Sequence, residues 1–272
     1  MASVPGDHDR ARGLASDGTG SHLTDSAGQP WEGRHLEVPA FAGDDGTAPP
    51  VLLEALRRFR AREVGYGDVV AALSGTRLLV PLLAMLGEAT TGPHGRPVEK
   101  SAEMAIVTVE GRDGRRVLPA FSSVAALSAW NPRARPVPVE AERVAVAAAA
   151  EGTDLVVLDP RSDTEFGLRR SALEALARGT AWRAPWHDPD IVDAVARSVV
   201  EERAVAAVDL VAGDPDAALS GAELAVRLEL RPGLDQEALD ALLGRLGRRW
   251  ADDGAMAAVD GISITLATAS GG

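Results

Sequence analysis

The stretch Arg115–Trp130, RRVLPAFSSVAALSAW, decides the fold that the sequence predicts. Its first half, Arg115–Phe121, is typical of a short buried strand, and the alanine-rich residues before Trp130 are typical of a helical turn. Ser122 or Ser123 can cap that helix, because a serine hydroxyl accepts a hydrogen bond from a free backbone N–H of the first turn. The stretch therefore predicts a strand that passes directly into a helix.

The residues upstream predict strands that join this one in a sheet. Glu110–Gly114, EGRDG, is rich in residues that accept a positive φ, so we predict a hairpin that pairs Met104–Val109 with Arg115–Phe121. Farther upstream, Arg77–Leu83 is typical of a buried strand. Pro81 within it favours an edge position or a bulge, because proline cannot donate to a strand ladder.

The patterns along the rest of the chain predict an α+β protein. We expect two α/β sandwich-type domains with mixed or antiparallel sheets, the first at residues 31–181 and the second at residues 182–272. In the first, Ser171 is expected to cap a helix that ends at Gly179. In the second, the order αββαβ predicts a small sheet with helices on one face. Residues 1–30 hold almost no large apolar side chain and are expected to form a disordered tail.

The bulk composition narrows the classes of partner. The formal net charge is -12 at pH 7, which opposes attraction to nucleic acid and to anionic membrane surfaces. The chain has no cysteine, which excludes disulfides and cysteine-ligated metals and agrees with a reducing cytoplasm. The densest apolar run, Leu78–Leu86, is far shorter than the ~20 residues of a membrane span. We expect a cytoplasmic protein that binds neither nucleic acid nor membrane and holds no cofactor.

Short motifs in the chain resemble those of the SseB family, in the actinobacterial form that pairs an SseB N-terminal domain with an SseB C-terminal-like domain. The most specific are Leu118–Ser123 with Leu127 and Trp130, and the later Leu158–Pro160. Further matches are Trp31–Arg34, Phe41–Gly46, Leu79–Leu82, Met104 and Gly111–Gly114. The resemblance runs from Trp31 to about Leu266, by pattern more than by motif in the C-terminal half. It implies the fold and a trait of enhanced serine sensitivity, but no reaction and no catalytic residues.

The sequence contains no complete catalytic or metal-binding motif. Neither Ser122 nor Ser123 lies in a Gly-x-Ser-x-Gly elbow, and Gly111–Gly114 lacks the lysine and the hydroxyl residue of a phosphate-binding loop. The histidines lack the spacing that places two imidazoles on one metal ion. They are His8, His22, His35, His94 and His187.

One set of polar and aromatic residues is a candidate binding rim. If the strand that begins near Glu103 pairs with Arg115–Phe121 in an antiparallel hairpin, its start lies near the end of its partner. The alternative is a solvated ion pair beside a helix cap and a core tryptophan. A deep polar pocket there would favour a sensor or an enzyme, whereas a shallow apolar surface would favour partner binding. The rim consists of Lys100, Glu103, Phe121, Ser122, Ser123 and Trp130.

Two further groups of residues each have a structural and a functional interpretation. Arg57, Arg58, Arg60 and Arg62 lie off the apolar stripe of one predicted helix, where they form a solvated face or receive an acidic partner. Trp182, Trp186 and Trp250 either anchor an interface or pack between the two domains.

The leading functional hypothesis is a non-enzymatic binding or regulatory protein that acts through protein contacts. The alternative is a small-molecule sensor, for an amino acid, with its pocket near residues 100–130. An unrecognised enzyme is the third hypothesis. The sequence leaves the partner and the oligomeric state open.

Overall fold

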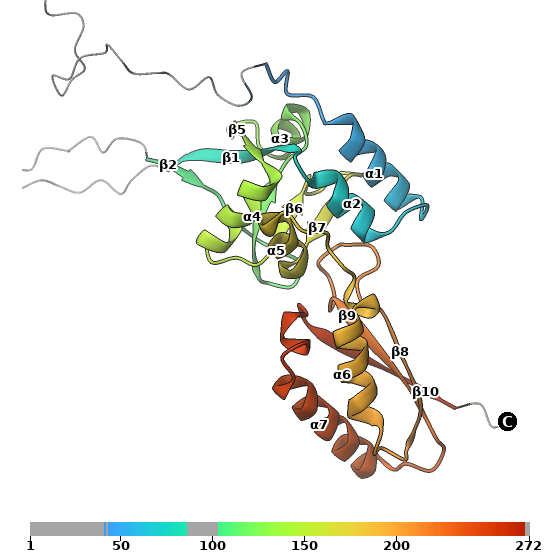
Figure 1. Cartoon of the computed structure of the whole chain (residues 1–272). Coiled ribbons are helices and arrows are strands. Elements are labelled where there is room, and N and C mark those ends of the chain that lie inside the picture. The colour runs from blue at the N-terminus through green and yellow to red at the C-terminus, as the bar shows by residue number, and fades with distance from the viewer. Residues whose placement is uncertain (1–40, 42, 86–102, 270–272) are drawn as a thin grey trace, which may run out of the picture. The chain divides into compact units, whose positions relative to one another are not determined.

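The computed structural model describes Phe41, residues 43–85 and residues 103–269 (Figure 1). The predicted tail at residues 1–30 lies outside the described residues. Residues Asp44–Gly272 form one compact unit that contains two separate large hydrophobic cores, and its helices and sheets confirm the α+β class. The predicted domain boundary at residues 181 and 182 falls between the last helix of the first core and the first α-helix of the second, and stays a prediction.

The first large core lies between four helices and one face of a four-stranded sheet. The sheet has the order β3-β4-β6-β7, in which β4 runs parallel to β6 and the other neighbours are antiparallel. Alternate residues point to opposite faces, so Leu118 and Leu158 enter the helix-covered core while Val117 and Val157 face the other way. These elements are α1 (Pro50–Arg60), α2 (Tyr66–Leu73), β3 (Val109–Glu110), β4 (Arg116–Ala120), α4 (Ala141–Ala150), β6 (Val156–Leu158), β7 (Phe166–Leu168) and α5 (Arg170–Arg178).

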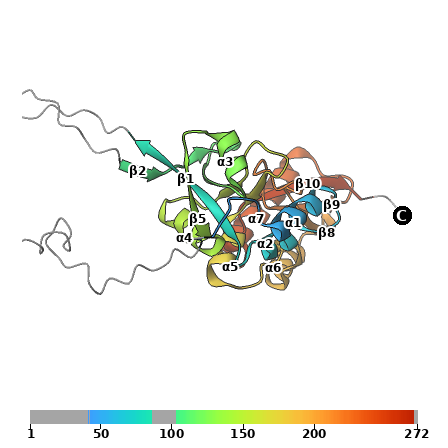
Figure 2. The same ribbon diagram turned by 90° about the horizontal axis from the view of Figure 1, so that it is seen from above.

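A second sheet, of order β2-β1-β5, joins the same core through β1. Leu78 and Val80 of β1 face the four helices, whereas Leu79 packs with Phe121 and Leu127 in a satellite core under α3. Figure 2 accordingly shows α3 on the opposite side of β1 from α4 and α5. The elements are β1 (Arg77–Met85), β2 (Glu103–Ile106), α3 (Val124–Trp130) and β5 (Arg135–Glu140).

Pro81 lies in the middle strand of this sheet, without a register shift, so the expectation of an edge or a bulge is wrong. Leu79 exchanges two backbone hydrogen bonds with Phe121, at 2.8 and 2.9 Å. The backbone of Pro81, two residues later, is directed to that same side of β1. Because β2 pairs with β1 only from Leu82 onward, Pro81 occupies a gap where no donor is needed.

The C-terminal elements confirm the predicted order αββαβ. The sheet has the order β10-β9-β8, with β10 parallel and β8 antiparallel to β9. Leu224, Val226 and Leu228 of β9 pack against α6 and α7 in the second large core. The elements are η1 (Pro185–His187), α6 (Pro189–Val199), β8 (Val205–Ala212), β9 (Leu224–Leu230), α7 (Gln236–Asp252), η2 (Met256–Ala258) and β10 (Ile262–Thr268).

The loop between β8 and β9, residues 213–223, packs on the sheet of the first core. Ala217 joins that core, and its carbonyl accepts a hydrogen bond from the backbone N–H of Gly167 at 2.7 Å. Leu219 packs on Val117 and Leu155 at the face of the sheet that the four helices leave free. A Cβ at Gly167 would lie 2.3 Å from Cγ of Leu219, so only glycine allows this close approach. We call this segment the β8–β9 loop.

Candidate functional site

Two turns meet at one edge of the β3-β4-β6-β7 sheet, because β4 and β6 are parallel and their carboxyl ends lie together. Ser122 follows β4, and Asp159 follows β6. The buried Asp159 carboxylate accepts hydrogen bonds from the backbone N–H and the hydroxyl of Ser122, at 2.8 and 2.7 Å, and from the Thr164 hydroxyl at 2.9 Å. Asp159 has a φ of 45°, a conformation that aspartate adopts more readily than most residues. One carboxylate therefore joins the two turns.

The two predicted serines have different structural roles. Ser123 is the N-cap of α3, where its hydroxyl accepts a hydrogen bond from the backbone N–H of Ala126 at 3.1 Å, so the predicted cap is confirmed. Ser122 is buried and donates its hydroxyl proton to Asp159 instead. Both hydroxyl groups are thus engaged in holding the fold.

The two aromatic residues of the predicted rim lie next to each other. Phe121 is fully buried, and its ring centroid is 5.3 Å from that of Trp130. Trp130, the last residue of α3, is only partly buried and lines a cleft. Of the four rim residues whose side chains the structure describes, Trp130 is therefore the one that lines this cleft.

Glu103 belongs to a different strand pair from the one that the sequence analysis assumed. β2 pairs with β1, with Glu103 opposite Met85, and only Val109 and Glu110 form the predicted hairpin with β4. The extended stretch changes sheets at residues 107 and 108, because an apolar alternation specifies which face is buried but not which strand is the partner. The structure therefore does not bring Glu103 to Phe121 through the hairpin. Lys100 lies outside the described residues.

The cleft beside Trp130 has an apolar floor. Val109 lies directly opposite Val117 in the register, and Val157 lies opposite Pro119, two residues after Val117. The three valines therefore share the face of the sheet that the four helices leave free. The cleft has a volume of about 350 Å³. We call it the Trp130 cleft; it is lined by Val109, Glu110, Gly111, Arg112, Val117, Trp130, Val157, Pro160, Arg161, Glu165, Ala218 and Leu219.

Charged groups surround this apolar floor. Glu165 accepts a hydrogen bond from the Arg112 guanidinium at 2.9 Å and one from the backbone N–H of Arg161 at 2.6 Å. The guanidinium of Arg161 donates to the Trp130 carbonyl at 3.2 Å and, among the described residues, has no carboxylate partner. Arg161 has a φ of 65°, so the turn after β6 contains a second residue with positive φ. The rim thus offers Arg112, which is paired with a carboxylate, and Arg161, which has no carboxylate partner within the described part of the chain.

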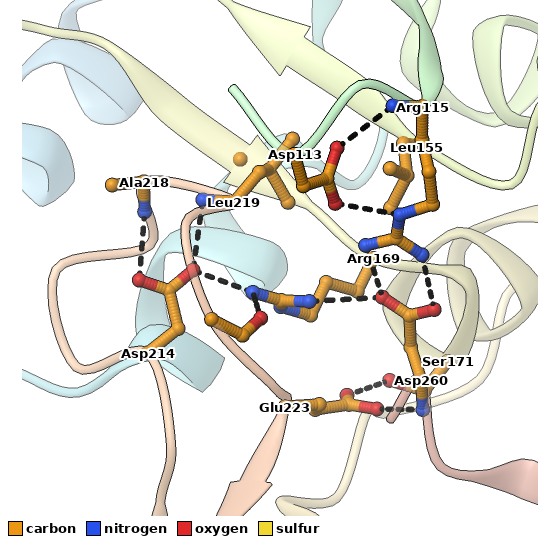
Figure 3. A network of polar contacts seen from close by, with 12 residues as sticks. Asp113, Arg115, Leu155, Arg169, Ser171, Asp214, Ala218, Leu219, Glu223 and Asp260 are labelled. Carbon is orange, nitrogen blue, oxygen red and sulfur yellow. Dashed lines mark hydrogen bonds and ion pairs between the residues drawn. The ribbon is translucent and has the colours of Figure 1, made fainter. Parts of the chain in front are cut away.

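A buried ionic network around Arg169 holds Asp214, near the start of the β8–β9 loop (Figure 3). The Arg169 guanidinium donates to Asp214 at 2.6 Å and to Asp260 at 2.9 Å. Asp214 in turn accepts the backbone N–H groups of Ala218 and Leu219, two residues that line the Trp130 cleft. The network therefore fixes one wall of the cleft.

Two carboxylates in this network, those of Glu223 and Asp260, have shifted pKa values. Burial raises the pKa of Glu223, against the hydrogen bonds that it accepts from the Ser171 hydroxyl and the Asp260 backbone N–H. Burial also acts to raise the pKa of Asp260, but hydrogen bonds from Arg115 and Arg169 outweigh it, so this pKa lies below its ordinary value. The network joins Arg115 and Arg169 to Asp214 of the β8–β9 loop and to Asp260 before β10.

Ser171 does not cap its helix as predicted. α5 begins one residue earlier, at Arg170, and its N-cap residue Arg169 makes no side-chain capping bond. The Ser171 hydroxyl accepts a hydrogen bond from the Trp182 indole at 2.9 Å and donates to Glu223. Both partners are distant from Ser171 in the sequence, by 11 residues for Trp182 and 52 for Glu223, so a capping rule that acts within the first turn could not identify them.

Two of the four arginines predicted to lie on one helix, Arg60 at the end of α1 and Arg62 just after it, bind the β8–β9 loop. Arg60 donates to the Asp216 carbonyl at 2.8 Å, and Arg62 donates to the Pro215 carbonyl at 2.6 Å and pairs with the Asp216 carboxylate. Arg57 and Arg58 form local pairs with Glu54 and Glu63. Two of the four residues thus hold the β8–β9 loop, and the other two pair within their own helix and the turn that follows it.

The three tryptophans of the C-terminal half pack in different places. Trp250 is buried in the second large core, and its indole N–H donates to the Ser198 hydroxyl at 2.9 Å. Trp182 packs against the first core and Trp186 against the second, with ring centroids 6.1 Å apart. The predicted packing between the two parts therefore applies to Trp182 and Trp186.

Within the described ranges, no group of three or more histidine, aspartate and glutamate side chains is arranged to hold a metal ion. No helix in the part of the chain that the structure describes is long and apolar enough to cross a membrane.

Comparisons with known proteins give one match. Residues 52–175 match the family described as SseB protein N-terminal domain. This segment includes β4, α3 and both turns that Asp159 joins, together with ten of the twelve residues that line the Trp130 cleft. Neither the curated protein sequences nor the solved structures gave a match.

Sequence reasoning found Trp130 but missed the groups that complete its cleft. Arg161 and Glu165 follow the Leu158–Pro160 motif, so the polar run after that motif was the available signal. Arg112 lies in the predicted hairpin turn, which placed it near β4 but not near Glu165. Leu219 had no local signal, because its position depends on the packing of a loop from the C-terminal region.

Proposed function

We propose that this chain is an SseB-family binding protein, not an enzyme, that acts in the cytoplasm by contact with a partner protein at the Trp130 cleft. The observation that carries the proposal is an apolar cleft between Trp130 and Leu219, in which Val109 and Val157 stay partly exposed beside the buried Val117. Burying such an apolar surface from water is the main driving force of protein association. The apolar lining of the cleft therefore favours partner binding over a deep polar pocket.

The polar groups near the cleft support binding over chemistry. Ser122 and Ser123 are engaged by Asp159 and by the start of α3, so their hydroxyls serve the fold. Arg112 and Glu165 pair with each other at the rim. An apolar floor with a polar rim is the arrangement found in protein interfaces.

The family match supports an extension to the whole chain. The matched segment ends at residue 175. Support for the rest of the chain comes from the order αββαβ of the C-terminal elements, which agrees with the sequence pattern. We propose that residues 182–272 are the SseB C-terminal-like domain of an actinobacterial family member. Its β8–β9 loop supplies Ala218 and Leu219 to the cleft, so both parts contribute to the proposed docking site.

A small-molecule sensor is the second candidate. Its support is the volume of the cleft, about 350 Å³, which lies within the range of ~300 to 1,000 Å³ usual for small-ligand sites. Thermal-shift titration with serine and other amino acids separates the two functions. We expect no change in the melting temperature, and a saturable rise for any one of them would favour the sensor.

Affinity purification from the source organism, followed by mass spectrometry, tests the leading proposal. The bait variant Ala218→Trp fills the cleft with an indole while keeping the backbone bond of residue 218 to Asp214. We expect the wild-type bait to enrich one or more partners that Ala218→Trp does not enrich. Ala251→Trp, on an exposed position of α7, is the matched control and should behave as wild type.

Partners that bind all three baits equally would place the contact elsewhere and contradict the Trp130 cleft as docking site. Turnover in a metabolite screen that Ala218→Trp abolishes would instead show an enzyme. Circular dichroism melting of the baits establishes that the two tryptophan variants are folded at the temperature of the experiment.

A further inference from the structure

We infer that the partner segment is an extended peptide that adds to the outer edge of β3, with an apolar and an acidic side chain on the face of the Trp130 cleft. The inference rests on the proposed function and specifies the partner's chemistry. It commits to β-strand addition, in which backbone hydrogen bonds give affinity and alternate side chains give specificity.

The edge of β3 is oriented to receive a strand. β3 is the outermost strand of its sheet, and no strand in the described ranges pairs with its outer side. The backbone N–H of Gly111 donates to the Arg115 carbonyl at 2.8 Å, toward β4. Backbone groups alternate in direction along a strand. The N–H and C=O of Val109 therefore also point toward β4, whereas the N–H and C=O of Glu110 point outward. Glu110 is exposed and lies beside the cleft.

This geometry fixes which side chains of a bound peptide reach the cleft. A peptide residue that exchanges hydrogen bonds with Glu110 directs its own side chain to the face opposite Val109. The residues before and after it direct their side chains to the face of Val109, over the apolar floor. The two side chains at the cleft are therefore two positions apart in the peptide.

The charges at the rim select the second of these side chains. Arg112 is paired with Glu165, whereas Arg161 has no carboxylate partner among the described residues and contacts the Trp130 carbonyl. A guanidinium binds a carboxylate with two parallel hydrogen bonds. An aspartate or glutamate two positions from the apolar anchor therefore complements Arg161, while the anchor packs on Trp130 and the valines.

The probe for the test is a phage-displayed library of random heptapeptides, selected on the full chain. Peptides that fail to bind Ala218→Trp but bind Ala251→Trp are synthesised, and their affinities are measured by fluorescence anisotropy. We expect the selected sequences to share an apolar residue and an acidic residue two positions apart. Arg161→Gln should weaken them about tenfold, while Arg248→Gln, an exposed arginine on α7, should not.

Backbone methylation of the peptide tests the strand addition without changing the protein. N-methylation removes one backbone donor. At the residue between the apolar and the acidic position it should weaken binding about tenfold, because that N–H meets the Glu110 carbonyl. At the apolar or the acidic position, where the N–H points away from β3, we expect less than about a twofold change.

The outcomes separate the inference from the proposed function. If no selected peptide is blocked by Ala218→Trp, the peptide inference is wrong, while the affinity purification decides separately whether a partner docks at the cleft. If peptides are blocked by Ala218→Trp but methylation has no alternating effect, the strand addition is wrong and the docking site stands. Cleft-binding peptides without an acidic residue, insensitive to Arg161→Gln, would overturn the role of Arg161.

Discussion

Asp159 connects the two sequence motifs that are most specific in this chain. It follows β6 in Leu158–Pro160, and its carboxylate accepts both the backbone N–H and the hydroxyl of Ser122, which follows β4. This carboxylate is the acceptor for three donors. A buried donor that loses its acceptor is costly, so the three contacts depend on the carboxylate. The two motifs thus hold each other in place through this carboxylate.

We expect Asp159→Ala to lower the free energy of unfolding by about 3 kcal/mol, since it leaves the N–H and hydroxyl of Ser122 without an acceptor. Asp159→Asn keeps one carbonyl oxygen and tolerates the positive φ, so it should cost about 1 kcal/mol. Urea unfolding followed by circular dichroism gives both values. Equal stability of Asp159→Ala and the wild type would show that the carboxylate contributes nothing to the junction of the two turns.

At the scale of elements, the β8–β9 loop depends on the absence of a side chain at Gly167. The close approach of Leu219 to this glycine seats the loop on the sheet and positions Ala218 and Leu219 at the Trp130 cleft. A methyl group at residue 167 would lie within 3 Å of Leu219 and of the Ala217 carbonyl oxygen, at 2.3 and 2.9 Å. The loop must therefore move away from the sheet to accept it.

Gly167→Ala should therefore lower the free energy of unfolding by about 2 to 3 kcal/mol, the usual cost of overpacking. Hydrogen exchange should also show faster exchange of the Leu219 amide, whose acceptor Asp214 is held by the seated loop. Gly247→Ala is the matched control, because a Cβ there meets no atom within 4 Å inside α7. It should raise stability by about 0.5 to 1 kcal/mol. A neutral Gly167→Ala would show that the loop does not need its observed contact.

Elements defined by local pattern were predictable, whereas their partners were not. The helix after Ser123, the αββαβ order and the cap at Gly179 follow from periodicity and capping rules that act over a few residues. The choice of β1 as the partner of β2 depends on packing between segments that are distant in the sequence. For the same reason Trp130 could be chosen from its motif, while Leu219 could not be assigned to its cleft.

At the scale of the whole molecule, the network around Arg169 joins segments of both cores. Arg169 and Arg115 come from the N-terminal region, and both donate to Asp260 near the start of β10. Ser171 of α5 donates to Glu223, next to β9. Because these charges are buried or partly buried, each is stabilised by the ionised form of its partner, and we expect the docking of the β8–β9 loop to depend on pH.

The two carboxylates with shifted pKa values predict opposite effects of acid on stability. Asp260 has a pKa below the ordinary 3.8, so its contribution is present above pH 3.8 and is lost as the pH falls through its folded value. Glu223 has a pKa above the ordinary 4.5. Its protonation favours the folded state, so its contribution is present below pH 4.5 and is lost as the pH rises through its folded value.

Urea unfolding of the wild type, Glu223→Gln and Asp260→Asn from pH 3 to pH 8 measures these contributions. The stability difference between the wild type and Glu223→Gln should move in favour of the wild type as the pH falls toward 4.5. The difference between the wild type and Asp260→Asn should shrink only below pH 3.8, where the Asp260 carboxylate takes up its proton. Glu174→Gln, at a partly exposed carboxylate that pairs with Arg178 on α5, is the control and should change little across the range.

If the Glu223 and Asp260 differences were both independent of pH, the two carboxylates would titrate alike in the folded and unfolded chain. The network would then hold the β8–β9 loop by shape and hydrogen bonding alone.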